Sequence, residues 1–169
     1  MTFFVLGLPR SRTAWLANFL TYDDLFCYHE GINGCHSMDE YKQKIENCGD
    51  SCTGLSFIDF EPYFPDAKKV IIDTSIDKAV KFGLDAYGVD MTDILKQAKN
   101  KLDNINGLHI GLNDINDRLR DIWEYITDKP FNEKRAQLLT KLNIQVNDVF
   151  DIDVESMLNL KESNELCLG

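Results

Sequence analysis

The feature that most constrains the fold of this chain is its opening segment, residues 3–16, which reads FFVLGLPRSRTAWL. An apolar run is followed by a turn that contains Gly7 and Pro9, and then by apolar residues at helical spacing. This pattern predicts a buried strand at residues 2–8, a tight loop, and a helix at residues 11–20. A strand that leads directly into a helix gathers unbonded backbone N–H groups and the positive end of a helix dipole at one point, which favours a bound phosphate group.

The rest of the chain alternates between strand and helix patterns. Further strands are expected at residues 25–29, 69–73 and 108–112, and helices at residues 37–47, 75–87, 92–102, 115–126 and 133–142, whereas residues 55–64 are ambiguous. The alternation predicts one α/β domain over residues 1–169, with three layers and a mostly parallel central sheet flanked by helices. In such sheets ligands bind beyond the carboxyl ends of the strands, which is where the loop after the first strand is expected.

The formal net charge is −10, so the surface as a whole is not expected to bind nucleic acid or an anionic membrane. Any anion site is therefore expected to be local. Every apolar run is shorter than the ~20 residues of a membrane-spanning helix, which predicts a protein without a membrane segment. The cysteines form no Cys-x-x-Cys pair and no leader sequence opens the chain, which predicts a reducing, cytoplasmic location.

Cysteines and histidines are concentrated between positions 27 and 52, and thiolate and imidazole are preferred zinc ligands. Their spacing matches no standard zinc motif, so no metal site is expected. The acidic segment from residue 148 onward is expected to be a partner-facing helix or a frayed end.

The loop after the first strand does not match the Walker A pattern. With Gly7 as the first glycine, Arg12 takes the position of the second glycine. Thr13 and Ala14 take the positions of the lysine and of the hydroxyl residue that holds magnesium. Phosphoryl transfer would lack the groups that neutralise the transferred phosphate, so a nucleotide kinase is only a third hypothesis.

The run GLPRSRTAWL, residues 7–16, resembles the 5′-phosphosulfate loop of sulfotransferases. The segments FPDAKKVIID, DKAVKFG and LHIGLNDI resemble later parts of the same family, in the same order. The resemblance implies a P-loop-type α/β fold that binds 3′-phosphoadenosine 5′-phosphosulfate without a metal. It also implies transfer of sulfate to a hydroxyl acceptor, which is expected to be small or presented by a partner because the chain is short for the family.

The resemblance assigns roles to individual residues of the loop. Arg10 would contact the sulfate-bearing phosphate and stabilise the negative charge that develops during transfer. The remaining cofactor contacts would come from backbone amides and hydroxyl groups of the loop, and from the start of a later helix. These cofactor-binding residues are Pro9, Arg10, Ser11, Arg12, Thr13, Ala14 and Ser75.

A transferase that acts on a hydroxyl also needs a base near the sulfur. Glu30 is the first candidate and His29 the second, because their position resembles the one where some sulfotransferases carry a catalytic glutamate or histidine. A general base works best when its pKa is close to the working pH. Side chains alternate along a strand, so His29 and Glu30 are expected to point to opposite sides, with at most one facing the site.

Two positions depart from the family pattern. Arg12 replaces a loop glycine, which is tolerated only if that position does not need a positive φ. The arginine that holds the 3′-phosphate falls on Thr74 or Ser75, and its partner serine falls on Phe82 or Gly83. A nucleotide without a 3′-phosphate is therefore an alternative cofactor. The alternative function is a non-catalytic protein of P-loop fold that binds a nucleotide or another protein.

Overall fold

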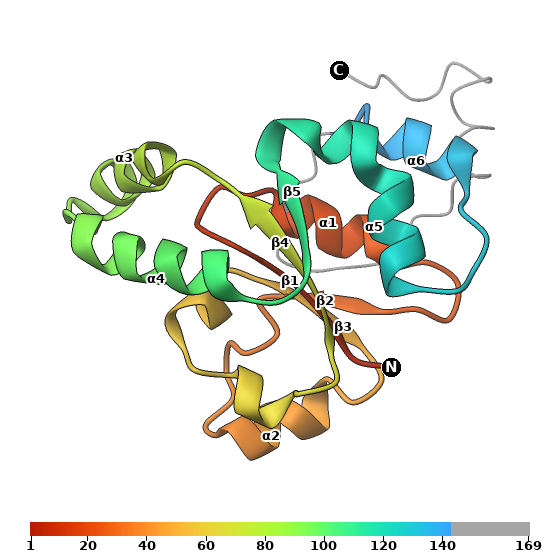
Figure 1. Cartoon of the computed structure of the whole chain (residues 1–169), viewed down its shortest axis with the longest axis horizontal. Helices are drawn as coiled ribbons and strands as arrows, with labels where there is room; N and C mark the ends of the chain where they lie inside the picture. The colour runs from red at the N-terminus through yellow and green to blue at the C-terminus, as the bar shows by residue number, and fades with distance from the viewer. Residues whose placement is uncertain (143–169) are drawn as a thin grey trace.

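Five parallel strands form the centre of the protein, which a computed structural model describes over residues 1–142 (Figure 1). The strand order is β2-β3-β1-β4-β5, and every neighbouring pair is parallel. The strands are β1 (Phe3–Gly7), β2 (Cys27–His29), β3 (Gly49–Cys52), β4 (Lys68–Asp73) and β5 (Leu108–Gly111). The sheet is therefore fully parallel, where the sequence predicted a mostly parallel one.

Helices cover both faces of the sheet. The α-helices are α1 (Thr13–Leu20), α2 (Met38–Lys44), α3 (Ile76–Tyr87), α4 (Thr92–Asn104), α5 (Leu119–Ile126) and α6 (Glu133–Leu139). Three short 3₁₀ helices, η1 (Gly54–Phe57), η2 (Glu61–Tyr63) and η3 (Leu112–Arg118), complete the described part of the chain.

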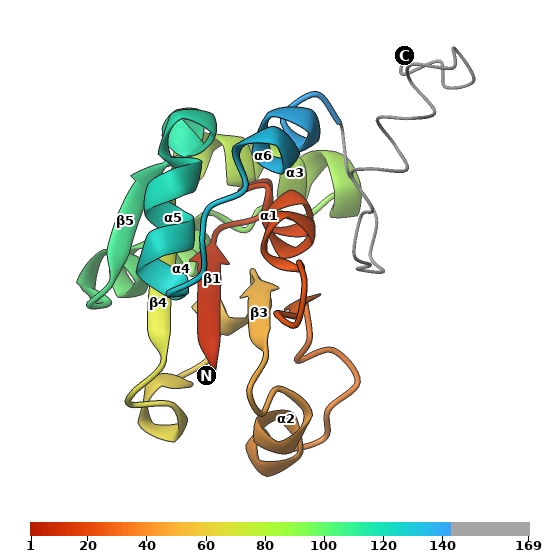
Figure 2. The ribbon, with the colours of Figure 1, turned by 90° about the vertical axis from the view of Figure 1, so that its right-hand side faces the viewer.

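The alternating side chains of β1 divide the core into two halves. Phe3 and Val5 pack with α1, α5 and α6, whereas Phe4 and Leu6 pack with α2, η1, α3 and α4. All four side chains are buried, as expected for the central strand of a parallel sheet. Figure 2 shows the strands pointing one way, with the connection from β1 to α1 at their carboxyl ends. The loop predicted to bind an anion therefore lies at the edge of the sheet where ligands bind in α/β folds.

Most predicted elements are confirmed, but one strand was missed. The sequence of β3 is GDSC, which contains no apolar alternation, although all four residues are buried between β1 and β2. The ambiguous residues 55–64 contain η1 and η2 rather than a strand or a long helix. The helix predicted at residues 115–126 is divided into the end of η3 and α5. The segment from residue 148 onward lies outside the described residues.

A buried arginine joins α6 to the carboxyl end of α1. Arg135 in α6 is 2% exposed and donates hydrogen bonds to the backbone carbonyls of Asn18, Phe19 and Thr21, at 2.8, 2.6 and 2.7 Å. The last carbonyls of a helix have no partner within the helix, and a cation at that end is favourable. Arg135 therefore supports the helix whose opposite end carries the predicted anion loop.

No helix within residues 1–142 combines the length and the apolar character that crossing a lipid bilayer requires.

Candidate functional site

The loop between β1 and α1 turns sharply because two of its residues adopt left-handed backbone conformations. Arg10 has a φ of 72° and Arg12 has a φ of 60°. The glycine that Arg12 replaces in the sulfotransferase pattern would take this conformation without a steric cost. Arg12 therefore does occupy a positive φ, and the loop keeps a strained arginine at the first residue before the helix.

Ser11 fixes the loop from the inside. Its side chain is fully buried, and its Oγ donates a hydrogen bond to the Leu8 carbonyl at 2.5 Å and lies 2.6 Å from the Thr74 Oγ1. A Cβ atom on Gly7 would lie only 2.7 Å from the Ser11 Cβ, so glycine is needed for this close return of the chain. Ser11 therefore connects the loop to the carboxyl end of β4, and its hydroxyl is occupied by the protein itself.

The backbone N–H groups of residues 10–14 point to an anion site. Among residues 1–142, no backbone or side-chain acceptor bonds these N–H groups, and α1 has no side-chain cap. The first turn of a helix leaves such groups unsatisfied, and the helix dipole places partial positive charge there. Consecutive N–H groups in a turn with left-handed residues form a concave site for an anion. No carboxylate of the described residues occupies this position.

The side chains of the two loop arginines contact different elements of the fold. Arg10 is exposed, and its guanidinium lies 5.6 Å from the centre of the Phe82 ring in α3. Arg12 is partly buried, stacks 4.4 Å from the Trp15 ring and donates to the Asn116 Oδ1 at 2.8 Å. Within residues 1–142 neither arginine forms an ion pair, so no carboxylate of the described residues neutralises either charge.

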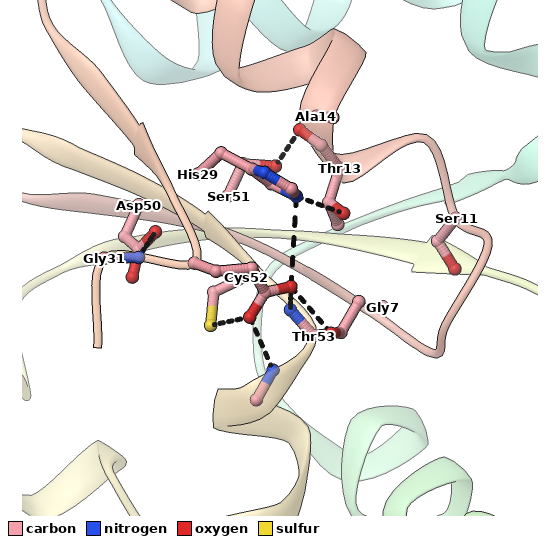
Figure 3. A network of polar contacts seen from close by, with 12 residues as sticks. Gly7, Ser11, Thr13, Ala14, His29, Gly31, Asp50, Ser51, Cys52 and Thr53 are labelled. Atoms are coloured by element: carbon pink, nitrogen blue, oxygen red, sulfur yellow. Dashed lines mark hydrogen bonds and ion pairs between the residues drawn. The ribbon is translucent and has the colours of Figure 1, made fainter. Parts of the chain in front are cut away.

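His29 lies beside the start of α1. Its Nε2 is 3.3 Å from the Thr13 Oγ1 and 4.0 Å from the Glu30 Oε1, as Figure 3 shows for the ring and Thr13. The expectation that His29 and Glu30 point to opposite sides is wrong. Glu30 follows the last residue of β2 with a φ of 55°, and this turn brings its carboxylate back toward the histidine.

The Glu30 carboxylate is engaged by the chain that follows β3. It accepts hydrogen bonds from the Thr53 N–H at 2.8 Å, the Thr53 hydroxyl at 2.6 Å, the Gly54 N–H at 3.2 Å and the Cys52 Sγ at 3.0 Å. Burial raises the pKa of Glu30, but these hydrogen bonds outweigh burial and hold the pKa below its ordinary value. This geometry gives Glu30 a structural role and makes its carboxylate a weak base.

His29 is the other candidate base, although burial weakens its affinity for a proton. Burial lowers the pKa of His29, and the nearby Glu30 carboxylate offsets this effect only in part. The ring is therefore neutral at neutral pH and can accept a proton. Its Nε2 faces Thr13 and is therefore the ring nitrogen directed toward the loop. Its Nδ1 is buried and has no hydrogen-bond partner among the described residues.

The missed strand β3 contributes several contacts to this site. Ser51 donates from its Oγ to the Thr13 carbonyl at 2.8 Å, which fixes the first turn of α1 against the sheet (Figure 3). Thr53, directly after β3, holds Glu30. The only signal for these roles in the sequence is a run of small polar residues, 49–54, that is long enough for a strand and contains no proline.

Asp50 of β3 holds the start of the β2–α2 connection to α2. Its carboxylate accepts from the Tyr41 hydroxyl at 2.5 Å and from the Gly31 N–H at 2.9 Å, and its side chain has no solvent exposure. Burial raises the pKa of Asp50 to about 6, although the Tyr41 and Gly31 hydrogen bonds oppose this shift. Ionisation of the Asp50 carboxyl group therefore costs more free energy in the folded protein than in the unfolded chain.

The raised pKa predicts how stability depends on pH. The folded protein binds the Asp50 proton more tightly than the unfolded chain, so this group lowers the free energy of unfolding as the pH rises from about 4 to about 6. Replacing Asp50→Asn removes this effect, and the stability of the variant relative to the wild type should rise by roughly 1 kcal/mol between about pH 5 and about pH 8. Urea unfolding at both pH values measures this difference.

The comparison of variant with wild type is needed because His29 titrates in the opposite sense. Because the pKa of His29 is lowered in the folded protein, this group lowers the free energy of unfolding as the pH falls. The pH dependence of the wild-type stability alone therefore combines the effects of Asp50 and His29. A relative stability of Asp50→Asn that stays constant, or falls, between these pH values would contradict an elevated pKa for Asp50.

The remaining predicted residues are Pro9, Ala14 and Ser75. Pro9 and Ala14 are half-buried, and the Ala14 N–H belongs to the row at residues 10–14. Ser75 is exposed at the start of α3, and within residues 1–142 its side chain makes no cap bond. Within residues 1–142, histidine, cysteine and carboxylate side chains do not gather into a group that could hold a metal ion.

Comparison with protein-family models, curated proteins and solved structures finds no match to this chain. The chemistry of the site therefore follows from loop 7–14, which offers N–H donors and two cations, and from His29, which offers a neutral imidazole beside that loop.

Proposed function

We propose that loop 7–14 binds the 5′-phosphate or phosphosulfate group of an adenine nucleotide, and that the protein transfers sulfate from 3′-phosphoadenosine 5′-phosphosulfate or a related nucleotide to a small hydroxyl acceptor. The observation that carries the proposal is the row of N–H groups at residues 10–14 that have no acceptor within residues 1–142, in a loop whose two arginines form no ion pair in that part of the chain. The resemblance of GLPRSRTAWL to the sulfotransferase loop supports the choice of a phosphosulfate. A P-loop-type fold accords with a loop that follows the central strand of a parallel sheet.

In this proposal the loop and His29 have separate roles in sulfate transfer. The nucleotide supplies the sulfuryl group, which leaves the phosphate oxygen and forms a new bond to the acceptor oxygen. The loop N–H groups and Arg10 stabilise the negative charge that develops on the phosphate oxygen as the sulfur–oxygen bond breaks. His29 accepts the acceptor's proton at Nε2, because it is neutral at neutral pH and faces the loop.

A second candidate function is a non-catalytic nucleotide-binding protein, and one observation favours it. Thr74 and Ser75 stand where the sulfotransferase pattern places the arginine for the 3′-phosphate. Thr74 is buried with its hydroxyl against Ser11, and Ser75 offers only an exposed hydroxyl. The chain therefore fits the 5′-phosphate end of the nucleotide better than the 3′-phosphate end.

Nucleotide titration tests the proposed function. We expect 3′-phosphoadenosine 5′-phosphate to raise the melting temperature of the wild type, since specific binding stabilises the folded state. Arg10→Ala and Arg12→Ala should each weaken binding by about 10- to 100-fold, because a hydrogen bond to a charged group contributes about 1.5–3 kcal/mol. Isothermal titration calorimetry measures the change. Arg120→Ala is a matched control, since Arg120 is an exposed arginine that contacts Glu124 and Glu133.

The nucleotide panel separates the alternatives. Equal binding of AMP and the bisphosphate favours the nucleotide-binding protein without a 3′-phosphate site. A shift that only ATP with magnesium produces favours a kinase. Absence of binding by AMP, ATP, the bisphosphate and 5′-phosphosulfate contradicts an anion site at loop 7–14.

A further inference from the structure

A cavity of about 680 Å³ lies on the α4 side of the sheet, and neither loop 7–14 nor His29 lines it. Its walls are the segment that contains η1 and η2 on one side and the exposed face of α4 on the other. In Figure 1 this segment is drawn in yellow, below and beside the green helix α4. The volume is in the range that binds small molecules.

The α4 wall presents amide side chains that the protein does not use. Gln97 and Asn100 are exposed, are three residues apart and line the cavity, so they lie on one face of the helix. Among residues 1–142, the side-chain amides of Gln97 and Asn100 have no hydrogen-bond partner. Each amide offers both donors and an acceptor, which matches hydroxyl groups.

Two large apolar side chains line the same cavity. Phe57 at the end of η1 is 38% exposed and Ile94 in the first turn of α4 is 48% exposed. The Phe57 ring therefore offers an accessible face beside the amides. An apolar wall with a few polar groups that fix orientation is typical of small-molecule sites.

Charged side chains of both signs line the cavity. Asp59 and Glu61 line it, and Glu61 is opposed by Lys69 at 3.7 Å. Lys101 also lines the cavity, but its ammonium group donates to the Ile58 carbonyl and lies 5.5 Å from the Phe60 ring. Asp59 forms no ion pair within the described residues. Lys101 keeps its positive charge, but Asp59 has no cation beside it among the described residues and therefore disfavours an anionic group placed next to it.

The structure assigns to this cavity a binding site for a small, hydroxyl-rich ring compound of neutral or positive charge, such as a neutral sugar or an amino sugar. The Gln97 and Asn100 amides bond the hydroxyl groups, the Phe57 ring packs against the apolar face of the ring compound, and Asp59 favours an amine over a carboxylate. None of its lining residues belongs to loop 7–14, although Ser56 joins the two regions through a hydrogen bond to the Gly7 carbonyl at 3.1 Å.

Titrations with glucosamine, glucose and glucuronate, followed by backbone amide NMR, test this site. We expect saturable shifts in residues 56–61 and 94–104 with glucosamine and glucose. Glucuronate should bind about fivefold more weakly than glucose, because a carboxylate close to Asp59 costs about 1 kcal/mol even in water, a unit charge pair at about 4 Å. The double variant Gln97→Ala/Asn100→Ala should bind glucosamine at least about tenfold more weakly than the wild type.

Gln43→Ala is the matched control, since Gln43 is an exposed helical amide of α2 outside the cavity. Its spectrum should respond to glucosamine as the wild type does. Three results overturn the assignment: no saturable shift with either glucose or glucosamine, glucuronate binding as tightly as glucose, or shifts that persist unchanged in the double variant. None of these results decides whether loop 7–14 binds a nucleotide, because calorimetry measures nucleotide binding separately on the same protein.

Discussion

Replacing His29→Gln should slow sulfate transfer by about 10²- to 10⁴-fold while leaving the affinity for 3′-phosphoadenosine 5′-phosphate close to that of the wild type. A positioned general base contributes a rate factor of about this size. Glutamine can still bond the Thr13 hydroxyl, which His29 Nε2 contacts at 3.3 Å, but it cannot accept the proton. Release of the bisphosphate in the presence of small alcohols and phenols measures the rate, and calorimetry measures the affinity.

The pH profile of transfer distinguishes His29 from Glu30. In the wild type the rate should rise with pH through the lowered pKa of His29 and then become level, because only the neutral ring accepts a proton. Glu30→Gln should keep a rising limb, since its carboxylate is occupied by Thr53, Gly54 and Cys52. A rising limb that survives in His29→Gln and disappears in Glu30→Gln would transfer the role of base to Glu30.

Replacing Arg135→Met should lower the free energy of unfolding by about 3–5 kcal/mol. The change removes the donor for three backbone carbonyls, those of Asn18, Phe19 and Thr21, in a position that is 2% exposed. Loss of one partner from a buried, charged hydrogen-bond network typically costs this much. Methionine fills part of the volume of the arginine side chain, so the decrease in the free energy of unfolding comes mainly from the lost polar contacts. Urea unfolding monitored by circular dichroism measures the effect.

Lys134→Met is the control for this measurement. Lys134 precedes Arg135 in α6 but is exposed, so its replacement should change stability by no more than about 0.5 kcal/mol. If Arg135→Met and Lys134→Met unfold at similar urea concentrations, the three carbonyl contacts do not stabilise the fold as described.

The elements that were predictable from the sequence carry their signal in apolar side chains. β1 is a continuous apolar run, β4 has an apolar centre at residues 70–72, and α3 and α4 show helical spacing. β3 shows neither, because its residues are small or polar and are buried by pairing with strands on both sides. Its stability as a strand comes from neighbours that are distant in the sequence, and no local pattern reports them.

The site was predictable in part for the same reason. The strand–loop–helix junction at residues 7–14 is a local feature, and the sequence places it at the carboxyl edge of the sheet. The approach of His29 and Glu30 was not predictable, because a positive φ at Glu30 is imposed by its bonds to Thr53 and Gly54. The contact of Ser51 with Thr13 depended on the missed strand.

The support that Arg135 gives to α1 links the two ends of the described chain. The arginine that holds the far end of the helix after loop 7–14 leaves the ribosome more than a hundred residues later than the loop itself. Domains generally fold as units once their chain is available. A nascent or truncated chain that stops before α6 would therefore carry the proposed anion-binding turn on a helix without this anchor, and we expect ligand binding to require the synthesis of α6.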